Sequence, residues 1–461
     1  MSIVMKFGGT SVADAAAFEN VARIVAAERE SSPVVVVSAM SGVTDSLLAA
    51  TTTAIEGNVN DAIASLEKTF QRHGAVANEL LPELEAVEFV DEVNSSAKRI
   101  TCLLQALKTE SNHKQIQDGV VSFGETLSST LLAAVMNQRG VAARQVDARR
   151  CVITNEEYTC AAPLIAETFA SCQKELRPLL DDNVVPVLGG FIAAALNGAT
   201  TTLGRGGSDY TAALVGAALS ANEIQIWTDV TGVLTADPRV VPEAQTIDRL
   251  SYSEAAELAY FGAKVLHPKT IQPAIESCIP VRICNSRAPH ERGTLVGPET
   301  ETSSRTLKAI AHKSGVTTVQ ITSARMLGAY GFLRALFEVF EKHRTVVDVV
   351  TTSEVSVSLS LDDAERLPQI VEELEQLGTV RVEKGRAIIC VVGEGLRGTP
   401  GVAAKVFSTI SDINVTLISQ GASSINFTFA IEEERMHEAV RRLHAAFFSH
   451  EKAQKAQKTV E

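Results

Sequence analysis

The start of the chain holds the residues with the clearest capacity for chemistry. A short apolar run leads to Lys6, and Gly8 and Gly9 follow almost directly. A strand that delivers a lysine into a glycine turn places a cation beside backbone N–H groups, and together these favour an anion such as phosphate. The order differs from a Walker A loop, because the lysine precedes the glycines and no GxxxxGK[ST] is present. The pattern predicts an anion site, and a plain strand–turn–helix connection is the alternative interpretation.

A second candidate is the segment 200–211, TTTLGRGGSDYT, in which glycines flank Arg205. An arginine in such a loop can hold a carboxylate through two parallel hydrogen bonds, which lysine cannot imitate. Ser208 and Asp209 precede a clean helical pattern, and either residue would suit the N-cap of that helix. The segment predicts a carboxylate site, and the competing interpretation is a solvated arginine beside a capped helix.

Polar residues also follow apolar runs further along the chain. Thr228 and Asp229 end one run, and Asp237 and Arg239 lie in the turn-rich stretch that comes next. Aspartates in this setting suit contacts to a nucleotide, although Asx turns have the same composition. Lys264, in FGAKVLHP, suits a phosphate contact, or is a surface lysine whose stem covers apolar neighbours.

The elements that would position these residues follow from the apolar runs. Short Val/Ile-rich runs alternate with helical patterns over residues 1–300, which predicts an α/β fold with a mainly parallel sheet and helices on both faces. Ligands gather at the carboxyl ends of the strands in such a sheet. SAMSGVT, which follows a buried run, and SFGET with Glu125 are therefore further candidates. The expected strands include 34–37, 184–187, 224–228 and 281–284, and the expected helices include 18–28, 128–138 and 162–176.

Other features divide the chain into parts. Residues 62–111 are charged and poor in strand signals, which predicts a helical insertion. Residues 287–306 are rich in Pro, Gly, Ser and Thr, and we expect a domain boundary there. Beyond it an internal repeat with constant offset aligns Gly331 with Gly401. Each copy combines an amphipathic helix, alternating strands and a charged helix, which predicts two ferredoxin-like modules.

Composition limits the class of protein. The 461 residues carry a net charge of -13, with 45% apolar and 21% charged residues, and no basic tract with interleaved aromatics. These values indicate globular domains and argue against a nucleic-acid surface. Seven cysteines without a CxxC pair argue against a disulfide framework. The chain has no signal-peptide pattern and no apolar stretch of membrane-spanning length, so we expect a cytoplasmic protein with no membrane partner.

Taken together, these motifs resemble those of the aspartate kinase family. The likeness covers residues 2–449, and the paired C-terminal modules resemble the ACT domains of that family. No GxGxxG and no residues for a second Rossmann domain follow them, so a fusion to homoserine dehydrogenase is not expected. The segments that carry the likeness are KFGGTSVAD at 6–14, TTTLGRGGSDYTA at 200–212, WTDVTGV with TADPR around Asp229, and FGAKVLHP at 261–268.

The resemblance implies a division into a catalytic and a regulatory region. The catalytic domain would occupy residues 1–297, with the amino-acid-kinase fold and the helical insertion. The regulatory region would occupy residues 306–461, with two βαββαβ ACT modules at about 312–384 and 386–450. ACT modules of this family usually pair between chains, so a homodimer or a higher homo-oligomer is expected.

The implied reaction moves the γ-phosphoryl group of ATP onto the side-chain carboxylate of L-aspartate. The product is 4-phospho-L-aspartate, at the first step of lysine, threonine and methionine biosynthesis. A carboxylate with a solution pKa of ~3.9 is already an ionised nucleophile, so no general base is needed. The obstacle is repulsion between two anions, which positioning and positive charge relieve. We therefore expect Lys6 and Arg205 to share one cleft, with Mg²⁺ bridging the phosphates.

The resemblance also implies roles for individual residues. Arg205 would hold the α-carboxylate of aspartate, and Glu125 would face its ammonium or orient Lys6. Leu234 stands where the family usually has a tyrosine, so a tyrosine contact to the nucleotide is not available. No side-chain metal site is implied. The catalytic set is Lys6, Gly8, Gly9 and Asp209; the aspartate set is Ser38, Thr44, Glu125, Arg205 and Ser208; the ATP set is Lys6, Gly9, Thr228, Asp229, Leu234, Asp237, Arg239 and Lys264.

Feedback control by an amino acid is implied by the ACT modules, with lysine as the effector. Asp348 and Glu354 are suitable partners for a cationic side chain or an α-ammonium. Ala329 replaces a serine that is often present in lysine-sensitive relatives, and ordinary turn and sheet-edge structure is the alternative interpretation of the effector positions. The complete effector set is Met326, Phe332, Leu333, Asp348, Ser353, Glu354 and Val355.

Three other functions remain as alternatives. One is a different amino acid kinase, acting on glutamate, acetylglutamate, carbamate or UMP, but those enzymes usually lack paired ACT modules. Another is an amino-acid-sensing regulatory protein with a degenerate kinase domain, which the presence of Lys6, Glu125, Arg205 and Asp209 in one chain disfavours. A Rossmann oxidoreductase is disfavoured by the lack of GxGxxG after the first strand.

Overall fold

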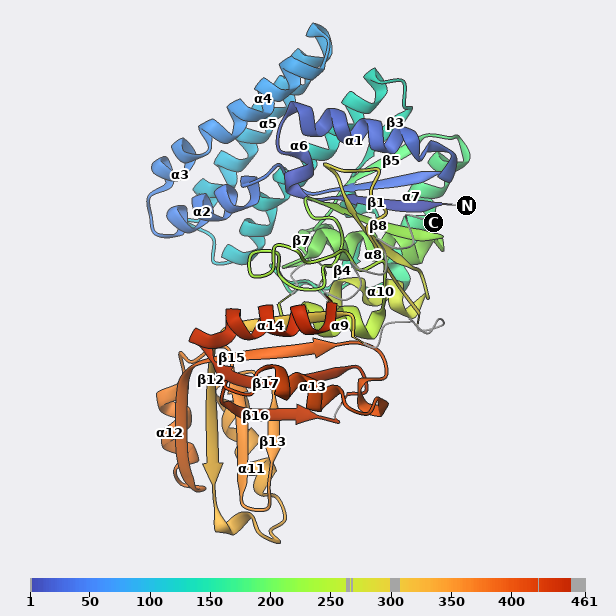
Figure 1. Cartoon of the computed structure of the whole chain (residues 1–461). Coiled ribbons are helices and arrows are strands. Elements are labelled where there is room, and N and C mark those ends of the chain that lie inside the picture. The colour runs from blue at the N-terminus through green and yellow to red at the C-terminus, as the bar shows by residue number, and fades with distance from the viewer. Residues whose placement is uncertain (1, 263–265, 267, 299–306, 422, 449–461) are drawn as a thin grey trace, which may run out of the picture. The chain divides into compact units, whose positions relative to one another are not determined.

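The computed structural model describes residues 2–262, 266, 268–298, 307–421 and 423–448. The chain forms two compact units (Figure 1). The first unit comprises residues 1–233, 248–252 and 265–298, and the second comprises 234–247, 253–264 and 299–461. Two segments of the expected catalytic domain therefore belong to the same unit as the regulatory region. Lys264, one of the predicted ATP-binding residues, lies outside the described residues.

The first unit is built on a sheet in which buried apolar strands run mainly parallel. Its strand order is β3-β5-β2-β1-β8-β10-β11-β9, with β1 between β2 and β8. Lys6 pairs in register with Val36 on one side and Ile226 on the other, so the ends of these three strands meet at one edge. The predicted fold class is confirmed. The strands are β1 (Ile3–Phe7), β2 (Pro33–Val37), β3 (Ala143–Val146), β5 (Val185–Gly189), β8 (Glu223–Thr228), β9 (Arg249–Ser251), β10 (Val281–Asn285) and the antiparallel β11 (Thr294–Gly297).

Helices and a small second sheet complete the first unit (Figure 1). Asp14 caps the first helix by accepting a hydrogen bond from the Ala17 N–H at 2.9 Å. The side chains of Phe7 and Phe18 are fully buried in the core between sheet and helices. The helices are α1 (Ala15–Ala27), α2 (Val43–Ile55), α6 (His113–Gln138), α7 (Ile165–Asp181), α8 (Gly207–Leu219) and α10 (Gln272–Glu276), and the small sheet has β4 (Ile153–Thr154), β6 (Ile192–Ala195) and β7 (Thr200–Thr202).

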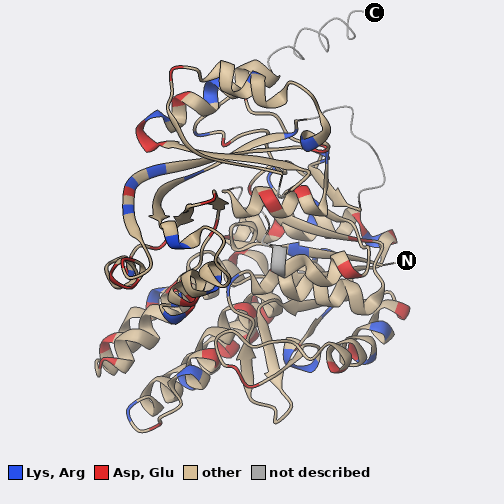
Figure 2. Ribbon diagram, turned by 90° about the horizontal axis from the view of Figure 1, so that it is seen from below, with Lys and Arg blue, Asp and Glu red and all other residues tan. Residues whose placement is uncertain are grey.

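The region expected to be a helical insertion contains α3 (Val59–Ser65), α4 (Glu67–Leu80) and α5 (Glu83–Ala106). These helices pack against one another and against α2 and α6. Figure 2 shows Lys and Arg interspersed with Asp and Glu along the ribbon, rather than gathered into one basic helix. The seven cysteines of the chain are free thiols.

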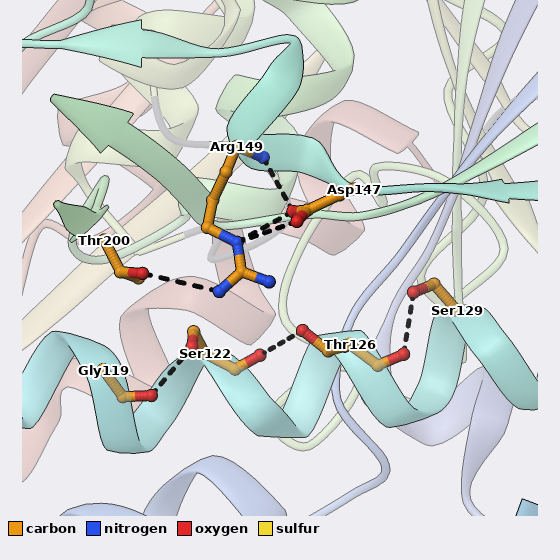
Figure 3. A network of polar contacts seen from close by, with 7 residues as sticks. All are labelled: Gly119, Ser122, Thr126, Ser129, Asp147, Arg149 and Thr200. Atoms are coloured by element: carbon orange, nitrogen blue, oxygen red, sulfur yellow. Dashed lines mark hydrogen bonds and ion pairs between the residues drawn. The ribbon is translucent and has the colours of Figure 1, made fainter. Parts of the chain in front are cut away.

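Helix α6 is the central helix of the first unit and carries Glu125. Contrary to the expectation from sequence, it is long and apolar enough to cross a membrane by length and composition alone, but 72% of its most apolar window is buried inside the structure. Three of its hydroxyl groups are satisfied within the helix, because Ser122, Thr126 and Ser129 donate to carbonyls about one turn earlier (Figure 3). These features are those of a core helix.

The second unit is built on one six-stranded sheet of order β13-β14-β12-β15-β17-β16. Gly331 and Gly401, which the repeat aligns, are both N-cap residues with left-handed backbone, at φ 84° and 85°. The predicted repeat is confirmed at these two aligned glycines, each of which begins the helix of its module. The elements are α9 (Tyr252–Tyr260), β12 (Ala309–Thr322), α11 (Phe332–Lys342), β13 (Val350–Thr352), β14 (Ser356–Leu361), α12 (Leu367–Leu374), β15 (Thr379–Val392), α13 (Val402–Thr409), β16 (Val415–Gln420), β17 (Asn426–Glu432) and α14 (Met436–Phe448).

The two modules share strands rather than standing as separate sheets. The long strands β12 and β15 pair antiparallel along most of their length, with register shifts between Lys313 and Thr318. The expected module boundary at 384–386 falls inside β15, where the chain passes through Gly385 at φ 67° without ending the strand. Each module nevertheless has its own core, one around Leu336 and Leu359 and the other around Phe429.

Candidate functional site

A cavity of about 770 Å³ opens in the first unit at the carboxyl ends of β1, β2 and β8. Lys6 and Arg205 both line it, so the expectation that these two residues share one cleft is confirmed. The predicted residues on the cavity wall are Lys6, Gly8, Gly9, Ser38, Thr44, Glu125, Arg205, Ser208, Asp209, Thr228 and Asp229.

Lys6 and Asp209 form an ion pair inside this cavity. The Lys6 Nζ lies 2.7 Å from Asp209 Oδ1, and the two side chains are 12% and 16% exposed. Lys6 comes from the end of β1, and Asp209 comes from the first turn of α8, where a negative charge is favoured by the helix dipole. The N-cap of α8 is Gly206, at φ 73°, so the prediction of Ser208 or Asp209 as the cap is wrong. Because Gly206 occupies the N-cap position, the Asp209 carboxylate is available to pair with Lys6.

Gly8 and Gly9, which follow β1, have different structural roles. The Gly8 N–H donates to the Trp227 carbonyl at 3.0 Å and continues the pairing of β1 with β8. A Cβ at Gly9 would lie 3.0 Å from the Ala39 carbonyl oxygen, so the turn passes tightly against the loop after β2 at this glycine. Since the Gly8 amide is already engaged, the Gly9 amide is the better candidate for a ligand contact.

Glu125 is a buried carboxyl group on the cavity wall. Burial raises its pKa to about 8, and a hydrogen bond with the Ala39 backbone opposes that shift only in part. Its Oε2 has no hydrogen-bond partner among the described residues. Two glycines allow this packing: a Cβ at Gly124 would meet the Ala39 Cβ at 2.8 Å, and a Cβ at Gly189 would meet the Glu125 Cβ at 3.0 Å. Such a group prefers to be neutral unless a cation approaches it.

Arg205 projects from the loop between β7 and α8. The flanking residues Gly204 and Gly206 both have left-handed backbone, at φ 74° and 73°. The residue is exposed and forms no ion pair with any carboxylate that the structure describes. Ser208 packs closely against Gly190, because a Cβ at Gly190 would lie 2.6 Å from the Ser208 Cβ. The loop thus presents an unpaired guanidinium to the cavity, as the sequence predicts.

Only some of the predicted nucleotide residues belong to the first unit. Thr228 ends β8 and donates to the Asp229 carboxylate at 3.2 Å. Leu234, Asp237 and Arg239 belong to the second unit, so their relation to the cavity stays a prediction. There the Arg239 guanidinium hydrogen-bonds Asp237 and lowers the pKa of that carboxyl.

Residues of the cavity wall that sequence reasoning missed include Phe191, Thr159 and Thr202. Phe191 follows Gly189 and Gly190 with φ 67°, which is unusual for a bulky side chain. The available signal was a second diglycine directly after a buried strand, which repeats the pattern after Lys6.

Six of the seven predicted effector residues are exposed or partly exposed. Phe332 and Leu333 begin α11, and Ser353, Glu354 and Val355 form the turn between β13 and β14, with Glu354 exposed. Met326 ends a short 3₁₀ helix before α11.

Asp348 differs from the other predicted effector residues, because its side chain is only 3% exposed. It accepts a hydrogen bond from the Tyr260 hydroxyl, and the Lys313 Nζ lies 3.6 Å from its Oδ2. Lys313 also pairs with Asp362 and lies 4.9 Å from the centroid of the Tyr260 ring. Burial is the main cause of a raised pKa at Asp348, and the hydrogen bond from Tyr260 and the charge of Lys313 oppose it.

The fold and the cavity define an amino acid kinase that carries ACT modules. Residues 1–285 match the amino acid kinase family, and residues 389–447 match the ACT domain. The chain is 41% identical to chloroplastic aspartokinase 3 of Arabidopsis thaliana, over 97% of this chain and 82% of that protein. It is 38% identical to lysine-sensitive aspartokinase 3 of Escherichia coli, over 97% of this chain and 99% of that protein. The chain belongs to the aspartokinase family.

Solved structures agree with this assignment. Escherichia coli aspartokinase III in complex with aspartate and ADP matches with a TM-score of 0.82 and 37% identity, over 97% of this chain and all of that one. The same enzyme in complex with lysine and aspartate matches with a TM-score of 0.81, over 97% of this chain.

Proposed function

We propose that this chain phosphorylates the side-chain carboxylate of L-aspartate with ATP to give 4-phospho-L-aspartate. The observation that carries the proposal is the meeting of Lys6, Arg205 and Glu125 on the wall of one cavity. A guanidinium, a carboxyl group and an ammonium in one cleft provide complementary partners for the α-carboxylate, the α-ammonium and the transferred phosphoryl group.

Aspartate is oriented by Arg205 and Glu125, neither of which has an ion-pair partner within the ranges that the structure describes. The Arg205 guanidinium holds the α-carboxylate through two hydrogen bonds, and Ser208 lies beside it at the start of α8. The α-ammonium faces Glu125, whose Oε2 has no partner among the described residues. This binding directs the side-chain carboxylate of the substrate towards Lys6, and the fixed geometry replaces a collision by a step within the complex.

Lys6 supplies the positive charge at the transferred phosphoryl group. Its ammonium is held by Asp209 at 2.7 Å, which keeps it aimed into the cavity. The aspartate carboxylate is ionised at neutral pH and attacks the γ-phosphorus directly, with ADP as the leaving group and no proton transfer required. The Gly9 amide adds a neutral donor beside Lys6.

ATP-dependent phosphoryl transfer uses a divalent metal, and we propose that it is Mg²⁺. Among the described residues no three His, Cys, Asp or Glu side chains are grouped to hold a metal. The cavity therefore suits an ion that would be held mainly by the phosphates and water, with Asp229 on the cavity wall as its protein partner. When bound, the ion neutralises charge on the phosphates.

We propose that lysine is the feedback effector and that it binds to the second unit. We also propose that the protein works as a homodimer, paired through the ACT modules. Several large apolar side chains are exposed in this unit, among them Leu333 and Val355. Exposed apolar groups beside the acidic Glu354 suit an effector that combines an aliphatic stem with a cationic end. Inhibition then requires that lysine bind a less active state more tightly. We propose that the protein works in the cytoplasm.

A hydroxamate assay tests the reaction. Protein, ATP, Mg²⁺ and aspartate are incubated with hydroxylamine, which converts an acyl phosphate into a coloured hydroxamate, and glutamate replaces aspartate as the comparison. We expect signal with aspartate and little with glutamate. Binding of lysine without any hydroxamate from aspartate would instead indicate an amino-acid sensor with an inactive kinase domain.

A further inference from the structure

Helix α6 carries a second buried carboxyl group, Asp118, that the reaction does not use. We propose that Asp118 is a positioning residue that fixes the Arg205 loop for binding the α-carboxylate of aspartate. The proposal rests on the function given above. Asp118 does not itself line the cavity, and its action passes through Thr159 and Thr202, which do.

Three hydrogen-bond donors converge on Asp118. Its Oδ2 accepts from the Thr159 N–H at 2.8 Å and from the Thr202 N–H at 3.1 Å. Its Oδ1 accepts from the Thr202 hydroxyl at 2.7 Å. Asp118 is fully buried, and burial raises the pKa of its carboxyl while these three bonds oppose the shift. A buried acceptor with this many fixed donors ties the donors firmly to α6.

The donors belong to the two segments that support Arg205. Thr202 ends β7 three positions before Arg205, and Thr159 lies in the loop between β4 and α7. The two segments are bonded to each other, because the Ala161 N–H donates to the Thr202 carbonyl at 2.9 Å. A Cβ at Gly204, next to Arg205, would lie 3.2 Å from the Cys160 sulfur, so the loop after Thr159 packs directly against the turn that carries Arg205.

The start of β7 is held in a separate way. The Arg149 guanidinium pairs with Asp147 at 2.9 Å and donates to the Thr200 hydroxyl at 3.4 Å (Figure 3). Thr200 is thus attached to the 147–149 segment and Thr202 to α6, which leaves Asp118 as the attachment nearer to Arg205.

Backbone strain supports the assignment. Thr159 has φ 73°, a conformation that a β-branched residue adopts only when its surroundings impose it. Its N–H is the one that Asp118 accepts at 2.8 Å. The carboxylate therefore holds a strained residue on the cavity wall, which plain core packing would not require.

The position of Asp118 on α6 links the two ends of the substrate. Glu125 lies seven residues further along the same helix, and residues seven apart share one helix face. One rigid helix face thus carries the partner of the α-ammonium and the anchor of the loop for the α-carboxylate. The spacing between the two subsites is set by α6, so loosening the anchor should weaken aspartate binding more than phosphoryl transfer.

Steady-state kinetics of Asp118→Ala and Asp118→Asn test this proposal. Alanine leaves three donors without an acceptor. Asparagine can keep all three contacts, because its carbonyl accepts both N–H groups and its amide donates to the Thr202 hydroxyl oxygen. Thr168→Val is the matched control: Thr168 is fully buried and bonded to Ile153, but it does not line the cavity.

We expect Asp118→Ala to raise the KM for aspartate about tenfold or more, with the KM for ATP unchanged and kcat within about threefold. Asp118→Asn should restore the KM to near the wild-type value, and Thr168→Val should leave it unchanged. A merely structural role would lower kcat with the fraction of folded protein and leave the KM alone, and that result would overturn the proposal. An unrestored KM in Asp118→Asn would overturn it too.

If Asp118→Ala does not fold, the Thr202→Val and Thr202→Ser pair carries the test, since only serine keeps the hydroxyl donor. A rise of about threefold in the KM for aspartate is expected for valine relative to serine, and equal values would reject the anchor. The wild-type hydroxamate signal separates the two proposals: without it the proposed function fails, whereas with it an unchanged KM rejects the role of Asp118 alone.

Discussion

Each unit of the molecule contains a lysine held against an aspartate, and the two pairs are built for opposite purposes. In the first unit Lys6 meets Asp209 at 2.7 Å in a cavity also lined by Arg205, which has no ion-pair partner in the described part of the chain. In the second unit Lys313 lies between Asp348 and Asp362 and beside an aromatic ring. The first pair has one carboxylate per cation, and the second has two.

The difference indicates which partner a ligand would need. An anionic phosphoryl group would be drawn to the ammonium of Lys6, and Asp209 then serves to aim it. A cationic effector would be drawn to the carboxylate of Asp348, and Lys313 then competes with it for the same oxygen atoms. A lysine–aspartate ion pair therefore supports ligand binding in the first unit and opposes it in the second.

Replacing Lys6 by alanine should have the largest effect. The change removes the charge at the transferred phosphoryl group, so we expect kcat to fall by about 10³-fold. Circular dichroism and thermal unfolding should match the wild type, because Lys6 lies at a strand end rather than in the core. Lys174→Ala, on the exposed side of α7, is the control and should retain full activity. Turnover like the wild type in Lys6→Ala would refute the assignment.

Replacing Asp348 by asparagine tests the other pair. The loss of this charge should raise the lysine concentration for half-inhibition by about 10- to 100-fold. The rate without effector should stay unchanged, since Asp348 belongs to the second unit. Inhibition curves at fixed ATP and aspartate measure the shift, and Asp363→Asn is the exposed neighbouring control. An unchanged curve would remove Asp348 from the effector site.

The sequence was sufficient to predict that Lys6 and Arg205 share one cavity, but not that Lys6 pairs with Asp209 there. Lysine, arginine and glycine loops at the ends of apolar runs are local patterns, and the parallel sheet brings such ends together. The cavity accordingly gathers Lys6, Glu125, Arg205 and Asp209 from β1, α6, the loop before α8 and α8 itself. The helix cap was predicted wrongly because Gly206 adopts a left-handed backbone that composition alone does not reveal.

The sequence was not sufficient for contacts that depend on distant backbone. Asp118 is one polar residue in an apolar helix, and its partners are 41 and 84 positions away. Tyr260 meets Asp348 across 88 positions, from a segment expected to belong to the catalytic domain. The expected boundary between the two modules fell at Gly385, inside the continuous strand β15. Each of these features depends on tertiary packing rather than on a local pattern.

Replacing Lys313 by methionine should shift inhibition in the opposite direction to Asp348→Asn. Methionine keeps the apolar stem and removes the ammonium that competes for Asp348, so we expect the lysine concentration for half-inhibition to fall about fivefold. The exposed Lys384→Met is the control and should leave the curve unchanged. A rise instead of a fall would mean that Lys313 contributes to effector binding rather than competing with it.

A change in protonation should accompany aspartate binding in the first unit. The pKa of Glu125 is raised from 4.5 to about 8 by burial, so at pH 7 the carboxyl group is mostly neutral. An α-ammonium beside it favours the ionised form, and we expect the release of about one proton per aspartate bound. Calorimetric titration in buffers of different ionisation enthalpy measures this number directly.

Glu125→Gln should release no proton and bind aspartate more weakly, which separates Glu125 from other titrating groups. The free protein should show the same group in its stability. Because the folded pKa of about 8 exceeds the ordinary 4.5, the folded state binds more protons between those values, and the free energy of unfolding should fall as pH rises through this range. Glu125→Gln should flatten that dependence. A steep fall that persists in the glutamine variant would assign the titration elsewhere and leave the α-ammonium without its proposed partner.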